Sequence, residues 1–418
     1  MSDREIFWAE WDGRAPGDTR DIERARLLVQ TLGTDDSERP VLTVVGSKGK
    51  GAAATYASAY LAAAGLRVVT VTSPELRNVR DRIRVDGRAV SEDDLAHLSM
   101  RLAAGRRALQ RYRPGRGYLS ASGLFTIAGV LHAAAVNAGA IVLEAGMGGA
   151  SDEVSLFPPT VVAITSVFGE HLGVLGNTLT EIAADKAGVV AADTRAVVSL
   201  PQDPAVAETI ASRVATVTAG RVCAETLEPG TGRPPGALLP AGLSRGNAEL
   251  GCVAARRLLT AIDRHPPSAA VLADVLSSIT LPGRASWHVV PGTPSRLFAD
   301  AAINRTGVAA ALQEVSRRWG GADRVLLCLP DHKDVSGVIT ELGELPVTFV
   351  RLTGDARLRF THALPRHWEI VDAARLDRAF LAARGRKLVA LGTGYFIARI
   401  LALVDAGTDQ IFTPPGSH

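Results

Sequence analysis

Cysteine is scarce in this sequence of 418 residues, which holds only Cys223, Cys252 and Cys328. Three widely spaced cysteines exclude a disulfide framework and a CxxC zinc site. Long apolar runs are also missing. The most apolar regions, 121–147 and 186–200, are broken by polar and charged residues, whereas a membrane-spanning helix needs about 20 predominantly apolar residues. The N-terminal residues show no secretory signal pattern. We therefore expect a cytoplasmic protein that does not engage a membrane.

Charge of one sign does not dominate either, because Lys+Arg 46 against Asp+Glu 43 leaves a formal net charge of +3. Such a small and interspersed excess does not favour a nucleic-acid-binding protein. Lysine is rare among the basic residues. Since an ammonium and a guanidinium are not interchangeable, a lysine retained against this bias hints that its chemistry matters. The five lysines are Lys48, Lys50, Lys186, Lys333 and Lys387.

Short β-rich runs alternate with longer helical patterns along the chain, and this alternation is typical of parallel βαβ units. The pattern changes after two Pro- and Gly-containing segments, 281–284 and 291–294. We predict an α/β protein with a P-loop mononucleotide-binding ATPase domain over 1–290. A smaller, Rossmann-like α/β domain is expected over 291–418.

The segment Gly46-Ser-Lys-Gly-Lys-Gly51 lies between a predicted strand, 41–45, and a predicted alanine-rich helix, 52–64. Glycines allow backbone N–H groups to approach phosphate oxygens, the helix N-terminus supplies a positive end, and a lysine reaches the terminal phosphates. The segment is shorter than the GxxxxGK[ST] form, and Ala52 replaces the hydroxyl residue after it. The alternative is an ordinary glycine-rich turn, but the context favours nucleotide binding by Gly46, Ser47, Lys48, Gly49, Lys50, Gly51 and Ala52.

This loop resembles the ATP loop of the folylpolyglutamate synthase and dihydrofolate synthase branch of the Mur ligase superfamily, which has a GTxGKGS pattern. Further resemblances follow in the same order along the chain. They are Thr72-Ser-Pro-Glu-Leu76 for SSPHL, Glu144-Ala-Gly-Met-Gly-Gly149 for EVGLGG, Thr165-Ser-Val-Phe-Gly-Glu-His171 for TSIGLDH, and Asp185-Lys-Ala-Gly188 for EKAG. Weaker matches are Asn247-Ala248, Pro282-Gly-Arg284, Asp300-Ala-Ala-Ile-Asn304 and Asp331-His-Lys-Asp334. Together they span residues 40 to 400.

Ser73, Glu144 and His171 each follow or end a predicted strand, so they can converge on the carboxyl edge of a parallel sheet, where ligands of open α/β sheets bind. Hard oxygen ligands suit Mg²⁺. Taken singly, a Ser-Pro turn or a core histidine is the simpler interpretation. The resemblance implies that these three positions are magnesium ligands. It also implies that Lys186 becomes carbamylated and helps to place a second metal ion, whereas the alternative for Lys186 is a solvated helical lysine.

The resemblance implies an ATP- and Mg²⁺-dependent ligase that joins a carboxylic acid to an amine through an acyl phosphate. Lys50, Lys186 and His171 are the expected catalytic residues. Asn247, Arg284 and Asp300 are expected to complete the ATP site at the junction of the domains, although each is as readily structural by itself. The expected partners are small-molecule acids and amines, and the chain is expected to be a monomer or a weak homo-oligomer.

Several positions on the organic-substrate side depart from the family pattern. Glu75 replaces a histidine, Ala150 an arginine and Ile303 the histidine of DGAHN, while Leu243 and Ser244 stand at a His-Gln pair. Replacing a hydrogen-bonding group can change substrate discrimination by orders of magnitude. These changes predict a non-folate substrate in specialised metabolism. A genuine folylpolyglutamate or dihydrofolate synthase and a non-catalytic nucleotide-binding regulatory subunit are the alternatives.

Overall fold

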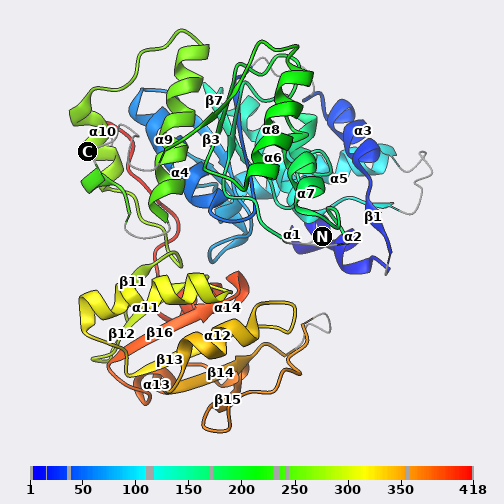
Figure 1. The fold of residues 1–418 in the computed structure, drawn as a ribbon. Coiled ribbons are helices and arrows are strands. Elements are labelled where there is room, and N and C mark those ends of the chain that lie inside the picture. Colours follow the sequence, from blue (N-terminus) through cyan, green and yellow to red (C-terminus); the bar gives the residue numbers. More distant parts are fainter. Residues whose placement is uncertain are drawn as a thin grey trace. The chain divides into compact units, whose positions relative to one another are not determined.

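The computed structural model describes residues 3–15, 17–34, 39–109, 117–169, 173–228, 236–240, 244–353 and 358–416. These residues form two compact units, each with its own mainly parallel sheet (Figure 1). Unit 1 comprises Met1–Pro74, Arg80–Ile279 and Asp409–His418, and unit 2 comprises Glu75–Val79 and Thr280–Thr408. The α/β fold class predicted from the sequence is confirmed.

The sheet of unit 1 has eight strands in the order β10-β9-β8-β2-β7-β3-β4-β5. The first six strands in this order are parallel, and β4 and β5 extend the sheet in antiparallel fashion. The central strands are fully buried runs of apolar and β-branched residues, which is the pattern of a parallel sheet covered on both faces. The strands are β2 (Val41–Val45), β3 (Val68–Val71), β4 (Ile83–Val85), β5 (Arg88–Ala89), β7 (Ala140–Glu144), β8 (Val161–Ile164), β9 (Ala196–Ser199) and β10 (Ala224–Thr226).

Helices α4 (Lys50–Ala63) and α9 (Ser244–Ala261) pack against each other on one face of this sheet, and α6 (Ala121–Ala135) lies on the other (Figure 1). Small alanine side chains let α4 lie buried along most of its length. A separate two-stranded sheet joins β1 (Thr19–Arg20) to β6 (Gly117–Tyr118). The remaining helices are α1 (Asp3–Phe7), α2 (Ala9–Gly13), α3 (Ile22–Leu32), α5 (Glu92–Ala108), α7 (Leu179–Ala187), α8 (Pro204–Val217) and α10 (Ala269–Ser277), with short 3₁₀ turns η1 (Val79–Arg82), η3 (Glu153–Leu156) and η4 (Gly236–Leu238).

Unit 2 contains a six-stranded sheet in the order β11-β12-β16-β13-β14-β15, in which only β11 is antiparallel. Side chains alternate between the faces of a strand, so successive residues of β16 enter two different hydrophobic clusters. The elements are β11 (Ser286–Val289), β12 (Arg296–Asp300), α11 (Arg305–Trp319), β13 (Arg324–Cys328), α12 (Val335–Leu342), β14 (Val347–Arg351), β15 (Glu369–Asp372), η5 (Ala373–Arg375), α13 (Arg378–Ala382), β16 (Lys387–Gly392) and α14 (Gly394–Leu403).

The division of the chain differs from the sequence-based boundary at 290/291. Strand β11 precedes that boundary, yet it pairs with β12 and so belongs to the sheet of unit 2. The C-terminal residues from Asp409 onward return to unit 1. In the described part of the chain, no helix combines the length and apolarity needed to cross a bilayer.

Candidate functional site

The glycine-rich loop connects the end of β2 to the start of α4, as the sequence predicts. Two positions in the loop require glycine for two reasons: the backbone has a positive φ, and a neighbouring residue lies where a Cβ would be. Gly46 has φ 131°, and a Cβ there would lie 2.0 Å from Thr165 Oγ1. Gly49 has φ 87°, and a Cβ there would lie 2.2 Å from the side chain of Asn247 on α9. The loop is therefore packed directly against the segment after β8 and against α9.

Two lysines meet at one carbonyl in this loop. Lys50 Nζ donates to the Gly46 carbonyl at 2.9 Å and to the Ser47 carbonyl at 3.4 Å. Lys186 Nζ, from the end of α7, donates to the same Gly46 carbonyl at 2.9 Å. Lys186 is only 1% exposed, so the interpretation of it as a solvated helical lysine is wrong. Two ammonium groups at the N-terminal end of α4 create a concentrated positive potential that suits an anion.

The other loop residues have distinct surroundings. The Ser47 hydroxyl is buried and donates to the Phe168 carbonyl at 3.1 Å, which ties the loop to the segment after β8. Lys48 is half-buried. Ala52 is buried in the first turn of α4 and brings no hydroxyl to the site. The expected loop residues thus lie together, but their hydrogen-bonding groups are mainly backbone N–H and ammonium groups.

Glu144 ends β7 and lies beside this loop with 5% of its surface exposed. Its Oε2 accepts a hydrogen bond of 2.8 Å from the backbone N–H of Ser73, which follows β3. A Cβ at Gly51 would lie 3.4 Å from the same oxygen. The structure therefore brings Ser73, Glu144 and the N-terminus of α4 to one edge of the sheet.

The donor chemistry of Ser73 and Glu144 fits Mg²⁺, because a hydroxyl and a carboxylate are hard oxygen ligands at the mouth of a phosphate-type loop. His171, the third predicted ligand, lies outside the described residues. Over the described ranges, no group of three or more His, Cys, Asp and Glu side chains could hold a metal ion by itself. A metal held here would therefore need water or nucleotide oxygens to complete its coordination.

Arg284 and Asp300 belong to unit 2. Asp300 ends β12, and its Oδ2 accepts a hydrogen bond of 2.7 Å from the backbone N–H of Ala285. This bond joins the backbone that follows Arg284, a half-buried residue, to the end of β12. Asn304 caps α11 by accepting from Gly307 N at 2.9 Å. Ile303 is half-buried and packs against the hydrophobic cluster on that face of the sheet.

Arg20 is not among the site residues predicted from the sequence, and it reaches the loop after β7. Arg20 Nη1 donates to the Met147 carbonyl at 3.1 Å and to Asp152 Oδ2 at 2.7 Å, and it lies 3.5 Å from Glu153 Oε2. Burial alone would lower the pKa of Arg20, but the carboxylates of Asp152 and Glu153 outweigh it and raise that pKa. Burial raises the pKa of Glu153. Arginine is the common basic residue here, so nothing in the sequence sets Arg20 apart.

The fold and the loop define an α/β chain of the P-loop type, and comparisons with known proteins narrow this class. No family model matches the chain. It is 34% identical over 224 residues to a probable bifunctional folylpolyglutamate synthase/dihydropteroate synthase of Halobacterium salinarum, a match covering 52% of this chain and 27% of that protein. It is 29% identical over 170 residues to the dihydrofolate synthase/folylpolyglutamate synthase of Bacillus subtilis, covering 40% of this chain and 39% of that protein. The chain thus matches less than half the length of these relatives.

Solved structures share the fold over nearly the whole chain. The apo form of L. casei folylpolyglutamate synthase superimposes with a TM-score of 0.78 at 20% identity, over 96% of this chain and 99% of that one. Mycobacterium tuberculosis folylpolyglutamate synthase, complexed with ADP and AMPPCP, gives 0.76 at 20% identity over 93% and 96%. The sequence matches confirm the resemblance to folylpolyglutamate and dihydrofolate synthases, and the solved structures show that the fold is shared.

Proposed function

We propose that this chain is an ATP-dependent carboxylate–amine ligase of the folylpolyglutamate and dihydrofolate synthase type. One observation carries the proposal: the ammonium groups of Lys50 and Lys186 both lie 2.9 Å from the Gly46 carbonyl, in a loop that also adjoins the Glu144 carboxylate. A regulatory subunit without catalysis would need only the loop, whereas this arrangement adds a buried ammonium and a buried carboxylate to it.

In the proposed reaction, an amide bond forms in two steps, and different residues of the site contribute to it. A carboxylate is a poor electrophile, so the acid first takes the γ-phosphoryl group of ATP and forms an acyl phosphate. The amine nitrogen then attacks the acyl carbon, its proton is lost, and phosphate leaves. Phosphoryl transfer depends mainly on positioning and charge neutralisation. Lys50 and the N–H groups at the start of α4 would hold the phosphates. Carbamylation of Lys186, which the resemblance implies, would convert its ammonium group into an anionic oxygen ligand for a second metal ion, while the remaining N–H could still donate to the Gly46 carbonyl.

A magnesium ion would be held by Ser73 and Glu144, with His171 as the third ligand that the resemblance implies. Its chemistry would be to neutralise charge on the phosphate oxygens. Asn247 on α9, and Arg284 and Asp300 in unit 2, remain candidates for nucleotide binding. Arg284 would contribute a forked donor for phosphate and Asp300 an acceptor for ribose hydroxyls.

We propose that the acid substrate is a folate-type compound and that the amine substrate is glutamate. The relatives are named as folylpolyglutamate or dihydrofolate synthases, and no comparison supports the non-folate substrate that the sequence changes suggested. The replacement of a histidine by Ile303 was one reason to expect a non-folate substrate. It is a weaker reason in the structure, because the Ile303 side chain packs against the hydrophobic core of unit 2. Its replacement of a histidine is therefore partly a matter of packing.

The test is a reconstituted reaction with ATP, Mg²⁺, L-glutamate and either dihydropteroate or a folate monoglutamate. We expect ADP and phosphate, with a product one glutamate heavier by mass spectrometry. Release of AMP and pyrophosphate would contradict the acyl-phosphate route. Turnover with other acids but not with either pterin compound would restore the non-folate interpretation.

Lys50→Ala is the matched variant for this reaction. Lys50 bonds to backbone carbonyls of its own loop, so we expect turnover to fall by about 100-fold or more while the unfolding midpoint in urea stays close to that of the parent. Arg107→Ala, on the exposed face of α5, should leave turnover unchanged. Equal activity of the two variants would remove Lys50 from the proposed mechanism.

A further inference from the structure

The loop that follows β7 lies against the last turn of α7, the helix that carries Lys186. The Asp185 carbonyl accepts a hydrogen bond of 2.8 Å from the backbone N–H of Ala150. A Cβ at Gly149 would lie 2.6 Å from Lys186 Cα, so the loop packs directly against the backbone of the lysine. Lys186 is 1% exposed, and its ammonium group donates to the Gly46 carbonyl at 2.9 Å. The loop therefore helps to bury the lysine that reaches the phosphate loop.

One side chain ties this loop to α7. Asp185 Oδ1 accepts a hydrogen bond of 3.1 Å from the backbone N–H of Ser151, and Asp185 Oδ2 accepts one of 3.1 Å from the Ser151 hydroxyl. Gly148 passes so close to this carboxylate that a Cβ there would lie 2.7 Å from Oδ2. Because Asp185 directly precedes Lys186, the attachment of the loop and the position of the lysine are linked through adjacent residues of α7.

The far end of the loop is held by a different part of the chain. Asp152 is fully buried and accepts hydrogen bonds from the backbone N–H of Met147 at 2.9 Å and from Arg20 of β1 at 2.7 Å. Charge-assisted hydrogen bonds of this kind are short and strong. Loss of the Asp185 side chain would therefore leave the loop fixed at Asp152, while the last turn of α7 loses both bonds to Ser151 and keeps the backbone bond from Ala150.

We propose that Asp185 is a positioning residue of the ligase reaction: by binding Ser151, it fixes the last turn of α7 and so keeps the Lys186 ammonium group at the Gly46 carbonyl. This inference rests on the function proposed above. Asp185 itself needs no contact with a substrate. The lysine side chain is long and has many rotamers, so the place of its nitrogen depends on a fixed backbone beneath it, and functional groups must be held within about 0.5 Å of their productive positions.

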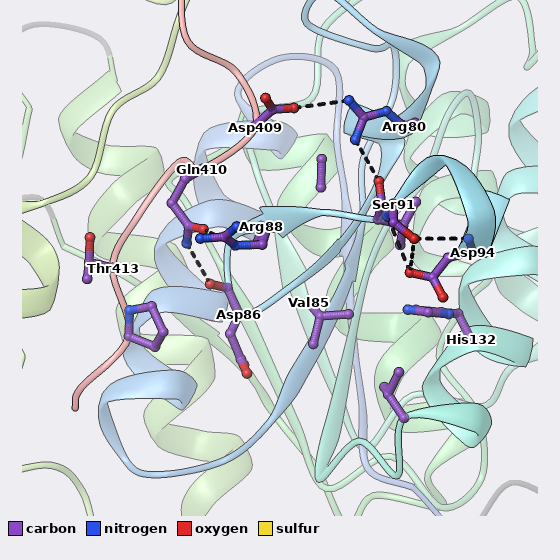
Figure 2. A pocket seen from close by; sticks show the side chains of 14 residues that line it. Arg80, Val85, Asp86, Arg88, Ser91, Asp94, His132, Asp409, Gln410 and Thr413 are labelled. Carbon is purple, nitrogen blue, oxygen red and sulfur yellow. Dashed lines mark hydrogen bonds and ion pairs between the residues drawn. The ribbon is translucent and has the colours of Figure 1, made fainter. Parts of the chain in front are cut away.

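The chain contains a second aspartate–serine pair with the same two kinds of bond, which supplies a matched control. Asp94 accepts from the backbone N–H of Ser91 at 3.3 Å and from the Ser91 hydroxyl at 2.6 Å (Figure 2). This pair belongs to the cap of α5 and lines a pocket beside β5 and the C-terminal segment. Asp94→Ala therefore removes equivalent bonds at a place in unit 1 other than the loop after β7.

The rate at which Lys186 reacts with an acylating reagent reports its position without an assay of turnover. The full chain is treated with acetic anhydride at one pH in bicarbonate-free buffer, so that the Lys186 nitrogen carries no carbamate, and acetylated peptides are quantified by mass spectrometry. Lys387, which is half-buried in unit 2, is the internal reference. A buried lysine reacts when its surroundings open, so we expect Asp185→Ala to raise the Lys186 rate about tenfold or more relative to Lys387, and Asp94→Ala to change it less than about twofold.

The conservative variant tests the two bonds themselves. Asp185→Asn keeps an acceptor for the Ser151 N–H and gains a donor for the Ser151 hydroxyl, so we expect its Lys186 rate to stay within about twofold of the parent rate. If Asp185→Ala does not fold, Ser151→Ala against Ser91→Ala decides, and only Ser151→Ala should accelerate Lys186. An unchanged Lys186 rate in the variants at Asp185 and Ser151, or an equal rise in the variants at Asp94 and Ser91, would overturn the proposal.

Turnover in the reconstituted ligase reaction is the second readout. Asp185→Ala should lower kcat about tenfold or more, because a small displacement of a catalytic group is costly, while the KM for ATP changes less because Lys50 is untouched. Asp94→Ala should match the parent. A parent without turnover would contradict the proposed function, and the acetylation rates would still decide whether Asp185 fixes Lys186. A parent that turns over, with an Asp185→Ala variant of equal kcat, would overturn this inference alone.

Discussion

At the scale of single residues, the phosphate loop depends on glycine at positions that no other residue can fill without moving a neighbour. Gly49→Ala would place a Cβ 2.2 Å from Asn247 in a left-handed conformation. Gly33→Ala provides a matched control, because Gly33 has φ 66° and a Cβ there meets nothing within 4 Å. We expect Gly33→Ala to lower the free energy of unfolding by about 1 kcal/mol, the backbone cost alone.

Gly49→Ala should lower the free energy of unfolding by more than the control does, and it should also abolish binding of a fluorescent ATP analogue, since the loop must shift away from α9. Urea unfolding monitored by circular dichroism and an equilibrium titration measure the two effects. An equal loss of stability in both variants, with nucleotide binding kept, would mean that the contact with Asn247 relaxes without cost.

The lysines show how much of the candidate site can be predicted from residue types. The scarcity of lysine is a hint for all five, and the glycine-rich loop and the family motif mark Lys50 and Lys186 among them; the structure places both at the Gly46 carbonyl. The substitution at Ile303 was a poorer guide to the substrate, because a change of residue type does not reveal whether a side chain faces a cleft or a core. Ile303 packs against a hydrophobic cluster within unit 2, and only the three-dimensional structure shows this.

At the scale of elements, Arg20 ties the N-terminal strand β1 to the loop that follows β7. Its side chain is 9% exposed and that of Asp152 is fully buried. Arg20→Ala leaves buried carboxylates without their cation, so we expect a loss of about 3–5 kcal/mol in unfolding free energy. Arg26→Ala removes an exposed pair with Glu23 and should cost less than about 1 kcal/mol. Similar losses in the two variants would contradict this assignment.

The same cluster predicts a pH effect at Glu153. Its pKa is raised in the folded protein, mainly by burial, so the folded state keeps a proton that the unfolded state loses above its ordinary value near 4.5. Stability from this group is therefore present at low pH and declines as the pH rises through the folded pKa. Glu153→Gln removes that decline.

Urea unfolding of the parent and of Glu153→Gln at intervals between pH 4 and pH 8 measures this effect. The difference in unfolding free energy should move in favour of the variant as the pH rises. A difference that is constant with pH, or that moves toward the parent, would show that Glu153 is ionised in the folded protein at low pH.

Elements with a strong local pattern were predictable. The strand at 41–45, the glycine loop and the capped helix after Ser91 follow from hydrophobic runs, glycine spacing and first-turn acids, and α5 has the expected capping box. The N-terminal helices and β1 were not predictable, because β1 has two residues and is held by the long-range pair of Arg20 and Asp152. Such a contact leaves no periodic signal in the sequence.

At the scale of the whole molecule, the chain returns to unit 1 at its C-terminal end. Ala89 N donates to the Asp409 carbonyl at 2.7 Å and Ile411 N donates to the Gly87 carbonyl at 3.0 Å, so this segment pairs with the edge strand β5. A few residues pairing with an edge carry no alternating pattern of their own. No pattern within 291–418 indicates this division, so the sequence predicts one continuous C-terminal domain.

Phe412 is the anchor of this returning segment. Its side chain is 1% exposed, and a Cβ at Gly87 would lie 2.8 Å from its ring, so ring and hairpin are in close contact. Replacing a fully buried phenylalanine by alanine removes apolar contacts and leaves a cavity, at a cost of about 3–5 kcal/mol. We therefore expect Phe412→Ala to destabilise unit 1 by this amount.

Hydrogen exchange followed by mass spectrometry separates an effect on unit 1 from one on the whole chain. In Phe412→Ala, faster exchange should appear in β4, β5 and the start of α5, while the strands of unit 2 keep their protection, because Phe412 is a buried residue of unit 1. Met100→Ala, at a position on α5 that is 62% exposed, should change neither unit. Equal acceleration in both units would mean that the two sheets unfold as one cooperative body, with Phe412 contributing to the stability of both.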